Sequence, residues 1–126
     1  MTESEALTLK KAECELAVYR KGFLCVKFDF VRNVLIWKDS NRWYNNFVRG
    51  LPESGMRPVH DAFLAFLKEC RDLAPDDSDE PHHYLWRVNL DDGGNSIEIT
   101  GSDIENESWR NLVQAVEKAG KRNFRL

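Results

Sequence analysis

The chain has 126 residues, of which 31% are charged, and a formal net charge of −3. This length fits a single domain, residues 1–126, that can bury a core of its own. No apolar stretch approaches the roughly 20 residues of a membrane-spanning helix, and the mild acidity argues against general binding to nucleic-acid phosphates. Three cysteines, Cys14, Cys25 and Cys70, are too few and too scattered for a disulfide framework. They predict reduced thiols in a cytoplasmic protein.

Residues 1–12 are predicted to be frayed or a short helix. From Cys14 to Lys38 apolar and polar residues alternate, which is the signature of β-strands. A first hairpin is expected to turn at Arg20-Lys21-Gly22. This register pairs Val18 with Leu24 and sets Glu15 opposite Lys27. Cys14 then points into the core, whereas Cys25 lies on the opposite face and is expected to be the only exposed thiol.

A second hairpin is predicted at Arg32-Asn33, because Asn tolerates the left-handed backbone of a tight turn. This register places Phe28 opposite Trp37. An 18-residue connector, residues 39–56, then leads to the first predicted helix. Connectors of this length are often functional.

The first helix is expected to begin at Pro58, a residue suited to the first helical position, and to end before Pro75. Its buried stripe comprises Val59, Ala62, Phe63, Phe66, Leu67, Cys70 and Leu73. A third hairpin follows, with strands around residues 84–90 and 97–100 and a turn at Gly93-Gly94 that pairs Leu90 with Ile97. Because a strand follows these glycines, they predict a hairpin turn and not a phosphate-binding loop.

The last helix is expected to carry Trp109, Leu112, Val113, Val116 and Ala119 on its buried side. Two starts are open: a capping box from Ser102 to Glu105, or a cap at Asn106. Gly120 is a typical stop. The basic tail, residues 121–126, leaves Phe124 and Leu126 free to dock on the body.

The element order is therefore β-β-β-α-β-β-α. It predicts an α+β domain with an antiparallel sheet of about five strands and two helices on one face. Hairpins alone do not give the order of the strands in the sheet.

The other face of the sheet is expected to stay open to solvent. We expect it to carry Ala17, Tyr19, Cys25, Lys27, Asp29, Ile36, Lys38, Arg87, Asn89, Glu98 and Thr100. The aromatic and arginine residues of the connector add the composition of a binding hot spot. For Trp43 and Phe47 we favour a short extra strand or helical turn packed over the sheet edge, because large aromatic side chains carry so much buriable area. The candidate partner-binding residues are Arg42, Trp43, Tyr44, Arg49, Tyr19 and Arg87.

No catalytic, metal or cofactor residues are predicted. His82-His83 follow an acidic stretch, residues 76–80, but no metal-ligand spacing is present. One alternative is a small-molecule or catalytic site under the connector, built from His60, His82 or His83 with Asp61 or Arg42. Another is nucleic-acid binding through Arg42, Arg49, Arg57 and the tail.

Residues 92–102, followed by Glu107-Ser108-Trp109 and a helix, resemble the C-terminal part of small bacterial proteins of unknown function. In that family a hairpin leads through a Gly-Ser step to a helix bearing Trp or Phe. This chain has residues 103–106, Asp-Ile-Glu-Asn, where the family has Asn-Ala-Tyr-Pro. The resemblance implies the fold and transfers no catalytic residue.

These observations predict a small soluble, non-enzymatic domain that acts through a protein partner or by self-association. Its size and mild acidity suit an accessory protein of the immunity or phage-related kind.

Overall fold

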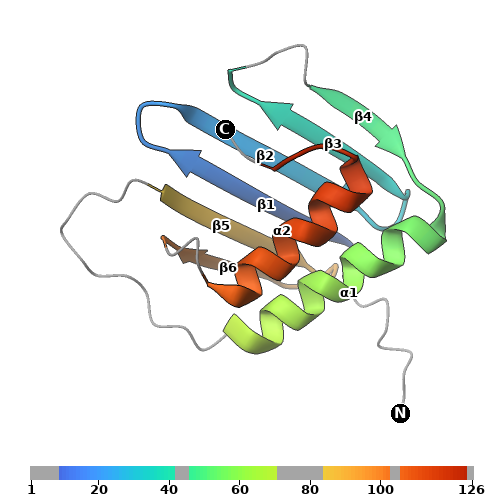
Figure 1. Cartoon of the computed structure of the whole chain (residues 1–126). Helices are drawn as coiled ribbons and strands as arrows, with labels where there is room; N and C mark the ends of the chain where they lie inside the picture. Colours follow the sequence, from blue (N-terminus) through green and yellow to red (C-terminus); the bar gives the residue numbers. More distant parts are fainter. Residues whose placement is uncertain (1–8, 42–45, 71–83, 103–105, 125–126) are drawn as a thin grey trace.

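The chain forms one antiparallel sheet of six strands with two helices packed against one of its faces (Figure 1). The structure, a computed structural model, describes residues 9–41, 46–70, 84–102 and 106–124. The elements are β1 Lys11–Val18, β2 Gly22–Asp29, β3 Val34–Asp39, β4 Phe47–Gly50, α1 Glu53–Cys70, β5 Tyr84–Asp91, β6 Ser96–Gly101 and α2 Glu107–Gly120. The predicted α+β class is confirmed, with one strand more than the order written from the sequence.

The strands lie in the order β4-β3-β2-β1-β5-β6. Strands β1 to β4 therefore lie side by side in reverse order. Strand β4 is at the edge of the sheet, and β1 is in the interior of the sheet. After α1 the chain returns to the sheet beside β1, and β5 pairs antiparallel with β1. Strand β1, early in the sequence, therefore lies beside β5, which comes much later in the chain.

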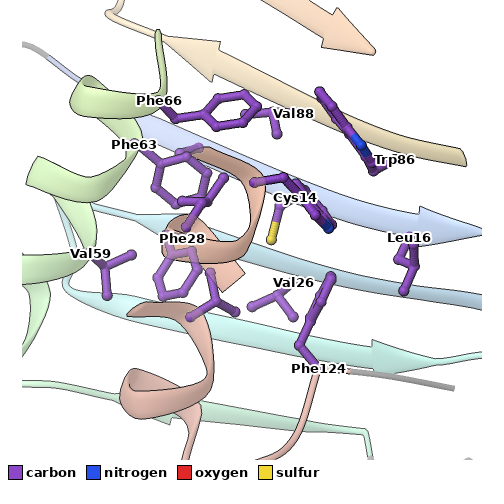
Figure 2. Packing of buried hydrophobic residues seen from close by; sticks show 14 of the residues in the cluster. Cys14, Leu16, Val26, Phe28, Val59, Phe63, Phe66, Trp86, Val88 and Phe124 are labelled. Carbon is purple, nitrogen blue, oxygen red and sulfur yellow. The ribbon is translucent and has the colours of Figure 1, made fainter. Parts of the chain in front are cut away.

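The two helices cover the face toward which the predicted apolar parity points. Trp37, Val26 and Cys14 are each fully buried under them, and Figure 2 shows several of these side chains packed together. The rings of Trp86 and Trp109 stack at 5.0 Å between centroids and link β5 to α2. Phe124 is buried against Trp37 and Trp109, as the sequence predicts for the tail.

The predicted registers of the first two hairpins are wrong by two residues, although every side chain keeps its predicted face. Leu16 lies opposite Leu24, and Glu13, not Glu15, lies opposite Lys27. The turn is one residue earlier than expected, since Lys21 N–H donates to the Val18 carbonyl and Arg20 takes a left-handed φ of 62°. A shift of two residues preserves the alternation of faces, so hydrophobic pattern alone does not distinguish the two registers.

The second hairpin has a wider loop than the predicted two-residue turn. Asp29 pairs with Val34, and the Asp29 carboxylate accepts hydrogen bonds from the backbone N–H groups of Val31 and Arg32. Asn33 takes the left-handed conformation expected of it, with φ of 58°. The side chain of Asp29 thus stabilises a four-residue loop. The third hairpin is as predicted: Leu90 pairs with Ile97 and Val88 with Ile99.

The start of α1 differs from expectation, whereas α2 begins at one of the two predicted starts. Helix α1 begins at Glu53, so Pro58 lies inside it. As the sixth residue of the helix, Pro58 cannot donate the helical hydrogen bond to the Ser54 carbonyl. Of the two open starts for the last helix, Asn106 is the cap: its side chain accepts a hydrogen bond from Trp109 N–H. The alternative, a capping box from Ser102, depends on Glu105, which lies outside the described residues.

Candidate functional site: the open face of the sheet

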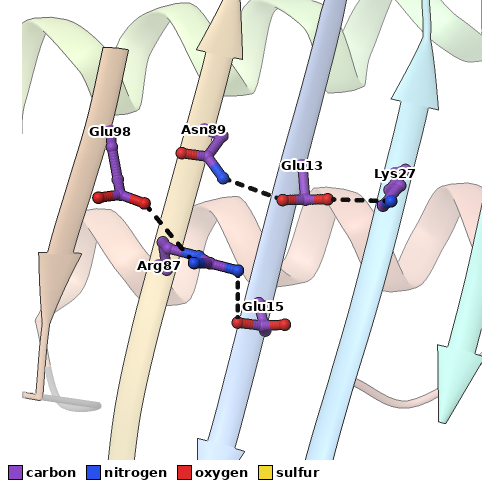
Figure 3. A network of polar contacts seen from close by, with 6 residues as sticks. All are labelled: Glu13, Glu15, Lys27, Arg87, Asn89 and Glu98. Atoms are coloured by element: carbon purple, nitrogen blue, oxygen red, sulfur yellow. Dashed lines mark hydrogen bonds and ion pairs between the residues drawn. The ribbon is translucent and has the colours of Figure 1, made fainter. Parts of the chain in front are cut away.

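The face of the sheet opposite the helices has no described element packed on it, and we call it the open face. Figure 3 looks onto it, with both helices behind the strands. The cross-strand register fixes which residues share this face. Four neighbouring strands carry Lys11, Glu13, Glu15 and Ala17 on β1; Phe23, Cys25, Lys27 and Asp29 on β2; Leu85, Arg87, Asn89 and Asp91 on β5; and Ser96, Glu98 and Thr100 on the edge strand β6.

An ionic network crosses the middle of the open face (Figure 3). Glu13 contacts Lys27 at 3.5 Å and accepts a hydrogen bond from the Asn89 side chain at 2.9 Å. Arg87 contacts Glu15 at 2.9 Å and Glu98 at 3.6 Å. All of these charged groups remain partly exposed, so each pair contributes only about 0–1 kcal/mol to folding.

Cys25 lies beneath this network and is buried, with 6% of its surface exposed. The expectation that it is an exposed thiol is therefore wrong, although its predicted face is correct. Burial, followed by the nearby carboxylates of Glu13 and Glu15, raises the pKa of Cys25 to about 12. Burial also raises the pKa of Cys14 and of Cys70. Since the thiolate is the reactive form, none of the three cysteines is set up as a nucleophile.

Beyond the network, one end of the open face is apolar. Ala17 lies between Phe23 on one neighbouring strand and Leu85 on the other. Phe23 is 44% exposed and Leu85 50%. We call Phe23, Ala17 and Leu85 the apolar stripe. Tyr19, 58% exposed, lies just beyond it at the end of the β1–β2 hairpin, with the Arg20 guanidinium over its ring.

The other end of the open face contains a shallow hollow of about 420 Å³. Its lining includes Lys11, Lys27, Asp29, Ile36, Asn89 and Asp91. Two of these carboxylates already serve the fold: Asp29 holds the β2–β3 loop and Asp91 accepts from Gly93 N–H. The hollow thus presents groups of both charges over a short length of sheet.

The predicted partner-binding residues do not form one site. Tyr19 and Arg87 lie on the open face. Arg49 is on β4, where its guanidinium donates to the Gly120 carbonyl at 2.9 Å and lies over the Phe47 ring. It therefore ties β4 to the end of α2. Arg42, Trp43 and Tyr44 lie outside the described residues.

The connector is shorter than predicted, because Phe47 belongs to strand β4 and α1 begins early. The extra-strand interpretation of Phe47 is confirmed: its ring stacks on Trp37 at 5.7 Å. The same interpretation for Trp43 concerns a residue outside the described ranges.

His60 is fully buried inside the domain. Its Nε2 accepts from Leu9 N–H at 3.4 Å, and its Nδ1 lies 3.2 Å from an Asp61 carboxylate oxygen. The edge of the ring packs against Phe30. These contacts give His60 a structural role. Since His82, His83 and Arg42 lie outside the described residues, the described part of the chain assembles no histidine site under the connector.

The arginines and lysines proposed for nucleic-acid contact are also dispersed. Arg57 pairs with Glu53 on its own helix at 3.8 Å, and Arg122 lies over the Phe47 ring. Lys118 and Lys121 lie at the end of α2, where positive charge complements the helix dipole. Among the described residues no group of three or more His, Cys, Asp or Glu side chains is arranged to hold a metal ion. The described helices include none with the length and apolarity needed to cross a membrane.

The sequence interpretation missed the four open-face residues Glu13, Glu15, Phe23 and Leu85. The alternation of apolar and polar residues does predict their face, because each stands at a strand position whose side chain points away from the core. The connector has a stronger compositional signal, because aromatic and arginine residues are denser there.

No protein-family model matches the chain, and no curated protein matches it significantly.

Proposed function

We propose that the chain is a non-enzymatic protein-interaction domain that binds through its open face. The apolar stripe is the observation that carries this proposal. Two large side chains, one on each side of Ala17 and in register across three strands, remain about half exposed, and the charged network borders them on one side. Exposed apolar side chains bordered by charged residues are typical of a protein-binding surface.

The charged network adds specificity more than affinity to such a surface. Groups of both signs at fixed positions favour a partner with the complementary arrangement and penalise others. The low contribution of these pairs to folding leaves them free to serve recognition. Three cysteines without disulfides suit a reducing compartment, which supports a cytoplasmic setting. Within this proposal, an accessory role of the immunity or phage-related kind remains our prediction.

A capture experiment with matched variants tests the proposal. The immobilised wild-type chain is compared with Leu85→Glu, which places a charge in the apolar stripe, and with Val48→Glu as the control. Val48 is 68% exposed on the edge strand β4, away from the stripe. A protein that is captured by the wild type and by Val48→Glu, but lost with Leu85→Glu, supports the proposal. Equal capture by all three folded chains contradicts it.

A further inference from the structure

We infer that the open face binds a second copy of this chain, through a two-fold axis that runs parallel to the strands between β1 and β5. The inference rests on the proposed function and names its partner. Around such an axis the two open faces pack in an aligned sandwich. Strand β1 then lies opposite the partner's β5, and β2 lies opposite the partner's β6, as the strand order requires.

The register makes this arrangement chemically complementary along the whole of β1. Each residue of β1 faces, on the partner, the residue that is its own cross-strand neighbour on β5. Lys11 faces Asp91 and Glu13 faces Asn89; Glu15 faces Arg87 and Ala17 faces Leu85. The last pair places a large side chain over a small one, so Ala17 and Leu85 of the two copies interlock near the axis.

The flanking strands extend the match. Lys27 lies in the same cross-strand row as Glu13, Asn89 and Glu98. It therefore faces the partner's Glu98 across the interface, while Cys25 faces Thr100. An axis along β1 itself would instead set Glu13 against Glu13 and Glu15 against Glu15. Since like charges directly opposite each other are unfavourable, the charge pattern favours the axis between β1 and β5 over an axis along β1.

The size of the contact fits a reversible dimer. Four strands spaced about 4.8 Å apart, with about 3.3 Å per residue along their length, cover roughly 500 Å² on each copy. The total of about 1,000 Å² is at the lower limit for a specific interface. We therefore expect association in the micromolar range, with β3 and β4 outside the contact.

A charge swap between two variants tests this partner directly by sedimentation. Lys27→Glu sets like charges opposite each other twice in the symmetric dimer, and so does Glu98→Lys. For each variant alone, the dissociation constant of the dimer should rise about tenfold or more relative to the wild type. An equimolar mixture of the two variants should recover dimer formation, because both contacts become attractive in the mixed dimer.

The recovery distinguishes contact between copies from damage within one copy. Lys27 also contacts Glu13, and Glu98 also contacts Arg87, in the same chain. Mixing two chains leaves those internal contacts broken, so only an intermolecular pair accounts for recovery. Circular dichroism confirms that each variant is folded, and the concentration dependence of wild-type sedimentation gives a readout that needs no variant.

Two results overturn the inference: a wild-type chain that stays monomeric up to millimolar concentration, or a mixture that associates no better than its components. The wild-type chain could instead be monomeric and capture another protein, with that capture abolished by Leu85→Glu. This result would reject self-association and would leave the proposed function standing. Monomeric behaviour with capture indifferent to Leu85→Glu would reject both.

Discussion

The backbone of Gly120 lies directly against the indole ring of Trp37. A Cβ atom at residue 120 would stand 2.5 Å from Cζ3 of that ring. The chain therefore needs a glycine at the end of α2 for close packing on the sheet. The left-handed residue that ends the helix is the next one, Lys121, with φ of 56°. The predicted stop at Gly120 is in the right place for a different physical reason.

Replacement of Gly120 by alanine is expected to destabilise the domain by about 1–3 kcal/mol, because the added methyl overpacks a fully buried indole. Urea denaturation measures the change. Gly94→Ala is the matched control, since a Cβ there would meet only a carboxylate oxygen at 3.9 Å. An equal effect of the two substitutions would contradict the packing explanation.

Replacement of Asn106 by alanine removes the side chain that accepts from Trp109 N–H. We expect a loss of about 1 kcal/mol in the free energy of unfolding. Asn106→Ser keeps a capping oxygen and should retain most of the stability. If serine and alanine are equally destabilising, the hydrogen bond is not what the residue contributes.

The three thiols are expected to react slowly with a disulfide reagent at pH 8 in the folded protein and quickly in denaturant. The raised pKa of Cys25, about 12, keeps its thiol protonated far above neutral pH. The same shift predicts a pH dependence of folding. The folded state holds this proton more tightly than the unfolded state does, so its contribution is full below pH 9 and declines as the pH rises toward 12. Rapid labelling of native Cys25 would contradict its burial under the network.

Removal of the Arg87 side chain as Arg87→Ala is expected to change folding stability by less than about 1 kcal/mol, because the side chain is 42% exposed. Added salt should reduce even this effect by screening. The same substitution should weaken association through the open face. Unfolding curves at low and high salt, compared with sedimentation, separate the two roles. A stability loss above about 2 kcal/mol would show that Arg87 serves the fold.

The sequence was most informative about which side chains face the core. Alternation placed Cys14, Val26 and Trp37 inside correctly, because a face has only two options on a strand. Alternation gave no information on a shift of two residues in the pairing of two strands. Such a shift changes the cross-strand neighbour of each residue but leaves its side chain on the same face. Hydrogen bonds from the Val31 and Arg32 N–H groups to the Asp29 carboxylate stabilise the loop of the second register, and no periodicity reports such contacts.

Other features depended on contacts between distant parts of the chain. Strand β4 is four residues long, too short for a periodic signal, and its Phe47 is fixed by Trp37 on the next strand. The apolar stripe combines residues from β1, β2 and β5, so it exists only once β5 pairs with β1. The hairpins alone do not give the order of strands in the sheet, so the sequence does not predict this stripe.

Methyl-resolved NMR of the wild-type chain, recorded as its concentration rises or as a captured partner is added, tests the binding role of the open face most directly. The account predicts that the Leu85 methyl resonances shift or broaden, while those of Val48 on β4 and Ile97 on the helix-covered face stay unchanged. Shifts at Ile97 with an unperturbed Leu85 would contradict it.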